Sequence, residues 1–279
     1  MNRKPRALAR LPQQLGIGPW RSAGWSTSAI YIVFIGLPVV ALLVRAAQQE
    51  SFLASLTSPL AMQALRLSLF TSTLSMAIVV LVGTPFAHWL ARSNSLPLRV
   101  VDSLVELPIV LPPVVAGVAM LMAFGRQGLL GPALSSLGIS LPFTTAAVIF
   151  AQIFVAAPFY IRSAKLGFQS VPLDYQEVSQ TLGVAPWNTF WRLTLPLARP
   201  SLLTGLTLAW ARAISEFGAT IMFAGNLTGQ TQTLPLAIMT AMESSLDTAL
   251  ALSVLLVVGA MLVLVVLGLL NRRRWQERV

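Results

Sequence analysis

Six runs of mostly apolar residues, each long enough to cross a lipid bilayer, divide this sequence. A helix needs about 20 mostly apolar residues to cross the hydrocarbon core of a membrane. The runs lie roughly at 27–46, 63–91, 104–124, 143–163, 201–223 and 247–270. We therefore expect an all-α integral membrane protein with about six transmembrane helices.

The composition supports the same class of protein. Of the 279 residues, 56% are hydrophobic and only 10% are charged, whereas a soluble domain carries about 25% charged residues. The absence of cysteine excludes disulfides, thiolate metal sites and thiol nucleophiles. The single histidine, His88, cannot build a histidine metal site alone.

The net charge of +10 could suggest a nucleic-acid partner, but its distribution follows membrane topology. Loops on the cytoplasmic side of membrane proteins carry an excess of Lys and Arg. The other loops here hold little beyond Arg45 and Arg126, and they carry Glu50 and Glu243. We therefore expect both termini in the cytoplasm and no nucleic acid. The basic residues of the tails and alternate loops are Arg3, Lys4, Arg6, Arg10, Arg21, Arg92, Arg99, Arg162, Lys165, Arg192, Arg199, Arg272, Arg273, Arg274 and Arg278.

The third run contains two adjacent prolines, Pro112 and Pro113. Proline lacks a backbone donor, so this pair should kink the helix. Membranes tolerate such breaks only where protein or a water-filled cavity satisfies the freed carbonyl groups. The run thus either lines a transport pathway or carries a kink with a purely structural role.

A charged segment, 172–196, lies between the fourth and fifth runs on the positive side. Asp174 can cap a helix, and Glu177 follows at the spacing of a capping box. Gly183 stands where that helix would end. One face of the predicted helix carries Tyr175, Val178 and Leu182.

A second short helix is predicted after this glycine. Pro186 suits its first turn, and we expect Leu195 and Pro196 to stop it before the fifth run. The surface of this helix is aromatic, with Trp187, Phe190 and Trp191. The hairpin either lies on the membrane surface, with Glu177 only as a cap, or docks a cytoplasmic protein.

The segment resembles the cytoplasmic signature of binding-protein-dependent ABC importer permeases. That signature reads Glu-Ala-Ala, three residues, Gly, nine residues, Ile-x-Leu-Pro. Glu177, Gly183, Leu195 and Pro196 stand at the matching positions. Val178 and Ser179 replace the two alanines, and Leu193 replaces the isoleucine. The resemblance implies that the chain is coupled to an ATPase through Glu177, Gly183, Leu193, Leu195 and Pro196.

Further stretches resemble the molybdate permease branch of this family, whose framework sulfate and tungstate permeases share. They are Leu107–Gly117, Phe124–Gly131, Ser215–Ile221, Phe223–Asn226 and Gln232–Pro235. The resemblance implies a type I ABC importer permease fold (MetI-like). It also implies an oxyanion as cargo, most closely molybdate, moved across the plasma membrane by alternating access.

The family resemblance implies partners and a division of the chain. The partners are two ABC ATPase subunits, a second copy of this chain, membrane lipid and an extracytoplasmic oxyanion-binding protein. The chain needs no cofactor of its own, because ATP and Mg belong to the ATPase. We divide it into a cytoplasmic basic tail (1–26), a first transmembrane helix with an outer loop (27–61), a permease core (62–270) and a second basic tail (271–279).

Arg212 and Glu216 lie inside the fifth run, four residues apart and so on one helical face. Charges at mid-bilayer cost about 2.5–3.5 kcal/mol and therefore find partners inside a bundle. The two form either a neutral pair that fixes helix packing or a polar element near the pathway. Ser215 and Thr220 could donate hydrogen bonds to a passing oxyanion, or serve only in helix packing.

Two isolated polar residues allow a functional and a structural interpretation. Arg126 lies on the outer side, either at the outer entrance or as a cap of the third run. His88, near the inner end of the second run, suits an interfacial anchor better than a proton relay.

The sequence contains no Gly-x-x-x-x-Gly-Lys-Ser/Thr loop, so we expect ATP to act on another subunit. We predict no catalytic site and no metal site. A secondary transporter or channel without an ATPase would carry an inverted repeat and acids at mid-membrane, for which only Glu216 qualifies. A membrane scaffold that recruits a cytosolic partner is the remaining alternative.

Overall fold

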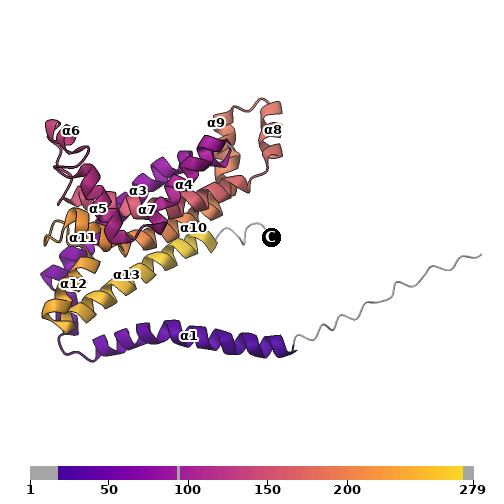
Figure 1. Cartoon of the computed structure of the whole chain (residues 1–279). Coiled ribbons are helices and arrows are strands. Elements are labelled where there is room, and N and C mark those ends of the chain that lie inside the picture. Colours follow the sequence, from indigo (N-terminus) through magenta and orange to yellow (C-terminus); the bar gives the residue numbers. More distant parts are fainter. Residues whose placement is uncertain (1–17, 93–94, 273–279) are drawn as a thin grey trace, which may run out of the picture. The chain divides into compact units, whose positions relative to one another are not determined.

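The computed structural model describes residues 18–92 and 95–272, and all regular elements there are helices. Figure 1 shows them in chain order. Their bounds are α1 Gly18–Ala47, α2 Phe52–Leu56, α3 Pro59–Ala91, α4 Leu96–Val110, α5 Pro113–Phe124, α6 Gly131–Ser136, α7 Thr145–Gln169, α8 Leu173–Thr181, α9 Pro186–Thr189, the π-helical η1 Phe190–Thr194, α10 Leu195–Ile214, α11 Gly218–Ala224, α12 Leu234–Ser244 and α13 Leu246–Arg272.

The prediction of an all-α membrane protein is confirmed. Within the described residues, α1, α3, α7 and α13 are each long and apolar enough to cross a membrane. The pair α4 and α5 would make a fifth span, although it is bent by 118°.

Two of the six apolar runs are not continuous helices, contrary to our expectation. The third run, 104–124, breaks at Leu111 and Pro112, where the backbone is extended instead of merely kinked. The fifth run, 201–223, breaks between Ile214 and Gly218. In the third run the cause is local, because Pro112 and Pro113 both lack the donor that a continuous helix requires.

The chain divides into two compact units, with the boundary after Gln48. The first contains α1, which begins at Gly18, earlier than the expected 27. The second contains all other helices. Of the predicted basic tails 1–26 and 271–279, residues 1–17 and 273–279 lie outside the described residues, whereas 18–26 belong to α1 and 271–272 to α13.

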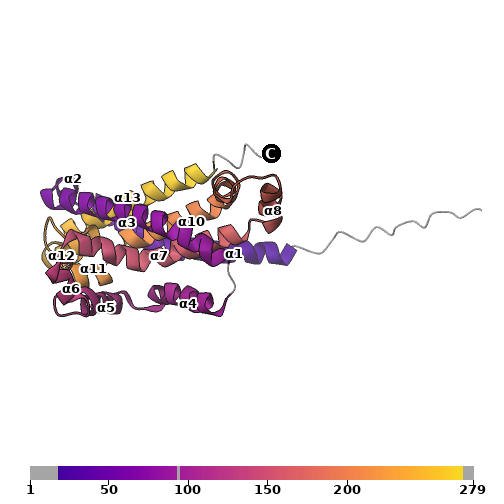
Figure 2. The same ribbon diagram turned by 90° about the horizontal axis from the view of Figure 1, so that it is seen from above.

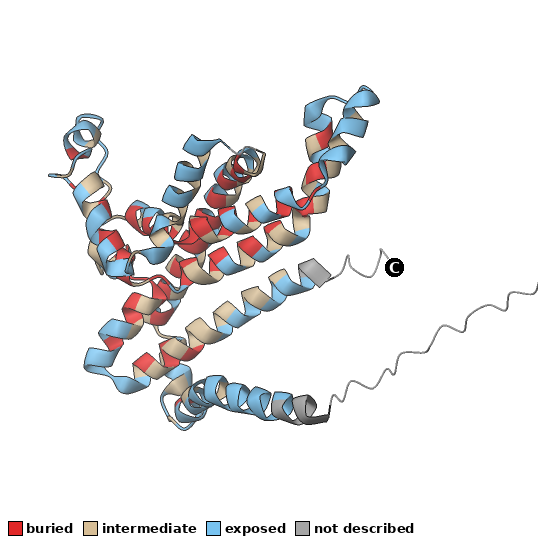
Figure 3. Cartoon of the chain, turned by 45° about the vertical axis from the view of Figure 1, so that its right-hand side comes forward, coloured by how far each residue is buried: buried red, intermediate tan, exposed pale blue. Residues whose placement is uncertain are grey.

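Helix α7 is the centre of the second unit and packs against α3 and α10 (Figure 2). One buried apolar cluster joins these three helices. Figure 3 colours the buried residues of the chain red. A second cluster joins α5 and α11 to the first half of α7, and a third joins α12 and α13 to the start of α3. The polar segments described below are therefore held by one continuous helical framework.

Small residues bring α7 and α10 into close contact. A Cβ atom added at Gly205 would lie 2.7 Å from Ser163 Cβ, and one at Gly167 would lie 2.6 Å from Ser201 Cβ. The Ser163 hydroxyl also donates to the Ser201 carbonyl at 2.7 Å. Small residues are the usual means by which membrane helices approach closely, and here they hold the middle of α10 against the end of α7.

Candidate functional site

The 172–196 segment forms a helical hairpin at the end of the second unit away from α6 and α12 (Figures 1 and 2). Its first arm is α8, which follows directly from the end of α7. Its second arm is α9, which continues through η1 into α10. The hairpin is thus attached to the framework through the two helices that pack most closely.

Gly183 ends α8 as predicted. Its φ is +75°, in the left-handed region that glycine adopts without strain. The Gly183 N–H donates to the Gln180 carbonyl at 2.9 Å, and the Val184 N–H donates to the Ser179 carbonyl at 3.0 Å. These two bonds make a Schellman motif. A Cβ here would meet nothing within 4 Å, so glycine is required by backbone conformation alone.

Two local predictions for this hairpin are wrong. Asp174 is not the N-cap of α8, because the helix already begins at Leu173 with Pro172 as its cap. Leu195 and Pro196 do not stop the second arm, because Pro196 lies in the first turn of α10. Pro196 cannot donate a hydrogen bond to a carbonyl of the preceding turn. The π-helical η1 replaces the α-helical hydrogen bonds there, and the Leu195 N–H donates to the Phe190 carbonyl.

Side-chain hydrogen bonds join the two arms. The hydroxyls of Ser179 and Thr189 are 2.7 Å apart, and the Gln176 amide donates to the Thr194 hydroxyl at 3.1 Å. Thr189 and Thr194 are buried. Leu193 and Leu195 are half-buried against the cluster of α3, α7 and α10. One side of the hairpin therefore anchors it to the framework.

The exposed side chains of the hairpin are largely apolar, and its two acids, Asp174 and Glu177 on α8, are both exposed. Glu177 is exposed and makes no ion pair within the described residues. Pro196 is also exposed. The exposed large side chains around Glu177 are Tyr175, Val178, Leu182, Trp187 and Trp191, the last two 69% and 50% exposed. Such a surface suits contact with another protein or with the membrane surface, the two interpretations of the sequence.

An aromatic cluster connects the hairpin to α3 and α7. The His88 ring lies edge-to-face at 5.0 Å from Phe190 and at 5.1 Å from Phe168. Phe190 also contacts the rings of Trp187 and Trp191. His88 thus packs between helix and hairpin. This contact was not evident in the sequence, because it joins residues far apart in the chain.

The second polar region lies at the break between α10 and α11. Arg212 Nη2 is 2.7 Å from Glu216 Oε2, in an ion pair without a well-directed hydrogen bond. The other carboxylate oxygen accepts the Ala219 N–H at 2.7 Å. The Glu216 side chain is fully buried, and that of Arg212 is 26% exposed. Glu216 therefore neutralises Arg212 and also accepts a hydrogen bond from the first turn of α11.

The neighbouring hydroxyl groups differ in their surroundings. Ser215 is exposed and donates to the Ala211 carbonyl at 2.9 Å. Thr220 is fully buried, and its hydroxyl has no hydrogen-bond partner in the described part of the chain. A Cβ atom on Gly117 would lie 2.7 Å from the Ala219 carbonyl oxygen, so α5 and α11 are in close contact beside Thr220.

Pro112 and Pro113 separate α4 from α5 and direct α5 towards α11. A Cβ added at Gly218 would lie 2.9 Å from Pro113 Cβ. Arg126 is exposed in the turn after α5. It does not cap α5, whose C-cap is Gly125.

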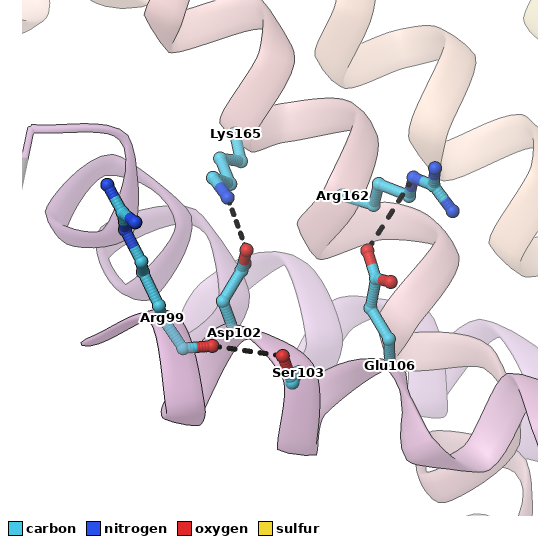
Figure 4. Close-up of polar contacts among 6 residues, drawn as sticks. All are labelled: Arg99, Asp102, Ser103, Glu106, Arg162 and Lys165. Carbon is cyan, nitrogen blue, oxygen red and sulfur yellow. Dashed lines mark hydrogen bonds and ion pairs between the residues drawn. The ribbon is translucent and has the colours of Figure 1, made fainter. Parts of the chain in front are cut away.

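Two ion pairs between α4 and α7, drawn in Figure 4, were not evident in the sequence. Lys165 Nζ is 2.6 Å from Asp102 Oδ2, and Arg162 Nε is 3.7 Å from Glu106 Oε1. Asp102 and Glu106 could have indicated these pairs, because they are two acids four residues apart in an otherwise basic part of the sequence. Among the described residues, no group of three or more His, Asp or Glu side chains suits a metal ion.

Comparison with known proteins assigns this arrangement to a family. Residues 80–276 match the model of the binding-protein-dependent transport system inner membrane component. The chain is 46% identical to the molybdenum transport system permease protein ModB of Mycobacterium tuberculosis (strain ATCC 25618 / H37Rv), over 85% of this chain and 89% of that protein. It is 33% identical to the sulfate transport system permease protein CysW of Synechococcus elongatus, over 96% and 94% of the two chains.

Solved structures share the fold. A bacterial ABC transporter involved in the import of the acidic polysaccharide alginate matches with a TM-score of 0.76 at 17% identity, over 92% of this chain and 96% of that chain. The inward-facing MetNI methionine ABC transporter matches with a TM-score of 0.58 at 19% identity, over 76% and 95%. The fold is that of type I ABC importer permeases. Since the family model covers most of the sequence, the chain belongs to the binding-protein-dependent transport system inner membrane components.

Proposed function

We propose that this chain is the permease subunit of an ATP-driven ABC importer that moves molybdate into the cell. The observation that carries the proposal is 46% identity to a molybdenum transport permease across 85% of the chain. Identity to a sulfate permease is lower, at 33%. Molybdate, tungstate and sulfate are all tetrahedral dianions, so tungstate or sulfate is the alternative cargo.

The exposed side of the 172–196 segment is the surface that docks the ATPase. Glu177 has no ion-pair partner within the described chain and stands among exposed apolar side chains. A partner can therefore satisfy the carboxylate and bury the aromatic rings together. ATP and Mg belong to two copies of this partner, in keeping with the absence of a P-loop from the sequence.

The importer works by alternating access between two copies of this permease, with both termini of each copy in the cytoplasm. An extracytoplasmic binding protein delivers the oxyanion and performs most of the selection. ATP binding draws the two ATPase subunits together and displaces the docked hairpins. The transmembrane helices then change conformation together with the hairpins. ATP can drive this change because the two conformations of the permease bind their partners with different affinities, as any driven switch requires.

Arg212 contributes to the pathway only weakly in this proposal. Its charge is neutralised by the buried carboxylate of Glu216, and a deep anion well would hold the cargo too tightly to release it. The exposed hydroxyl of Ser215 is the better candidate for transient contact, whereas the geometry of Glu216 favours a role in packing.

The test is uptake of radiolabelled molybdate into proteoliposomes that contain the permease, its ATPase and its binding protein. We expect uptake that requires ATP, with competition by tungstate stronger than by sulfate. Uptake without the ATPase would favour a secondary transporter. ATPase association with no uptake of any of the three anions would favour a scaffold. Preferential uptake of sulfate would reassign the cargo within the same fold.

A further inference from the structure

Helix α4 is held to α7 by charged groups along one edge of its packed face (Figure 4). Asp102 and Glu106 lie one turn apart on α4, and Lys165 and Arg162 lie one turn apart on α7. Leu98, Val101 and Val105 of α4 pack beside them against the cluster of α3, α7 and α10. The contact therefore combines a modest apolar face with two ion pairs.

The two ion pairs differ in strength. The Asp102–Lys165 pair is short, at 2.6 Å, and its side chains are 33% and 22% exposed. The Glu106–Arg162 pair is 3.7 Å apart, with side chains 43% and 62% exposed. Exposed ion pairs contribute little because water screens them. Asp102 and Lys165 therefore make the dominant polar contact between the helices.

The charges also specify how α4 lies along α7. Asp102 pairs with Lys165 and Glu106 with Arg162, so the two helices are antiparallel along this contact. A shift of one turn would bring Arg99 towards Lys165, and like charges in contact are unfavourable. The ion pairs thus favour one register over its neighbours.

This contact lies close to the hairpin in the chain. Lys165 is in the last turns of α7, and α8 begins at Leu173. The hairpin is therefore connected through the chain to the end of α7 that carries the ion pairs.

At its other end, α4 leads through the bend at Leu111 and Pro112 into α5. Helix α5 is in close contact with α11, as the space around Gly117 and Gly218 shows. In the first turn of α11, the Ala219 N–H donates to the Glu216 carboxylate. A continuous series of contacts thus joins the hairpin, the end of α7, α4, α5 and the break beside Glu216.

We propose that the Asp102–Lys165 pair, supported by Glu106–Arg162, transmits displacement of the 172–196 segment from α7 to the α4–α5 unit. Asp102 and Lys165 are positioning residues for transport: they hold α4 to α7 so that the two helices move together. This inference rests on the proposed docking of an ATPase to the hairpin.

The first experiment neutralises, reverses and exchanges the charges. The variants Asp102→Asn, Lys165→Gln and Lys165→Asp are compared with the double exchange Asp102→Lys/Lys165→Asp, each in the complete transporter in proteoliposomes. We expect each single variant to bind the ATPase normally and to lower molybdate uptake per ATP hydrolysed by about fivefold, the factor that corresponds to about 1 kcal/mol. The exchange should restore most of the uptake.

Two matched controls separate transmission from general damage. Glu106→Gln removes the weaker pair and should lower coupling less than Asp102→Asn does. Ser103→Ala changes an exposed side chain of the same helix, whose hydroxyl donates only to the Arg99 carbonyl, and should leave coupling unchanged.

A distance measurement tests the movement itself. Since the sequence has no cysteine, spin labels can be placed at Val100 on α4 and Gln169 at the end of α7, both exposed. In the parent complex we expect the label distance to stay the same with and without ATP. In Asp102→Asn it should differ between the two states.

The outcomes distinguish this inference from the proposed function. Unchanged coupling in Asp102→Asn and Lys165→Gln, or an exchange variant no better than Lys165→Asp, would overturn the transmission role. A label distance that changes with ATP in the parent complex would do the same. If the parent chain failed to bind the ATPase, the docking proposal itself would be wrong.

Discussion

The hairpin and the α10–α11 break are the two polar regions that the sequence singles out, and they use their charges in opposite ways. Glu177 in the hairpin is exposed and has no ion-pair partner in the described chain, whereas Glu216 in the break is fully buried and contacts both Arg212 and the Ala219 N–H. The hairpin carboxylate is free for another protein. The buried carboxylate is already used by the fold.

This difference separates residues that bind a partner protein from residues that stabilise the folded permease. Substitution in the break should reduce the amount of folded permease, and substitution in the hairpin should reduce coupling while the permease stays intact. The predictions below test that division, from the largest expected effect to the smallest.

Glu216→Leu should have the largest effect. It leaves Arg212 without its counter-charge and the Ala219 N–H without its acceptor. Breaking a buried ion pair costs about 3–5 kcal/mol, and the partial exposure of Arg212 places this case near the lower limit. Yield in the membrane and heat stability of the purified permease measure the loss.

The matched double variant Arg212→Leu/Glu216→Leu removes both charges. It should recover part of the stability, because replacing a whole buried pair by apolar side chains is often neutral. A stable Arg212→Ala variant with altered anion preference would contradict the packing role and place this pair in the pathway.

Gly183→Val should have an intermediate and local effect. A β-branched residue at φ +75° is strained by about 1–2 kcal/mol, while the space around the position stays open. We expect normal membrane yield and reduced molybdate uptake per ATP hydrolysed. Gly183→Asn is the matched control, since asparagine tolerates this conformation. Equal transport by the valine variant and the parent chain would show that the bend is unimportant.

Glu177→Arg should weaken binding of the ATPase without changing stability. Loss of an exposed carboxylate at a protein contact and its replacement by a cation should cost about 1–2 kcal/mol in association. Co-purification of the ATPase with the permease measures this change. Gln180→Arg adds a cation at another exposed position of α8 and is the control. Undiminished co-purification of the Glu177 variant would refute its docking role.

Ser215→Ala should have the smallest effect on stability. The residue lies next to Glu216, but it is exposed and donates only to carbonyls of its own helix. We expect the stability of the folded permease to change by no more than about 0.5 kcal/mol. The measurement is its heat stability, compared with that of Glu216→Leu. If Ser215→Ala lost as much heat stability as Glu216→Leu, exposure and burial would not distinguish these two neighbouring residues. The proposed separation of binding residues from stabilising residues would then fail.

The sequence predicted those features that depend on residues near one another in the chain. Gly183 ends α8 because the left-handed backbone of a Schellman motif favours glycine. Arg212 and Glu216 lie within reach because a spacing of four places them on one face. The same local reasoning failed at Asp174, which lies inside α8, and at Pro196, where the second arm continues into α10.

The break between Ile214 and Gly218 was not evident in the sequence, because that part of the apolar run contains no proline. The bend is compatible with the fold because Glu216 satisfies the Ala219 N–H and because α11 packs closely on α5 at Gly117 and Gly218. Hydropathy reports only how apolar a segment is and carries no information about such contacts.

The sequence alone determined the class of protein, the positions of its apolar runs, the hairpin with its glycine and the family resemblance, since all of these follow from composition and short spacing. Only the tertiary structure decided that Glu216 turns inward while Glu177 stays exposed, that His88 packs between Phe168 and Phe190, and that Asp102 meets Lys165. The physical reason is that the burial and partners of a charged or aromatic side chain depend on helices distant in sequence, and pairing decides whether its charge stabilises the fold or remains available to a partner.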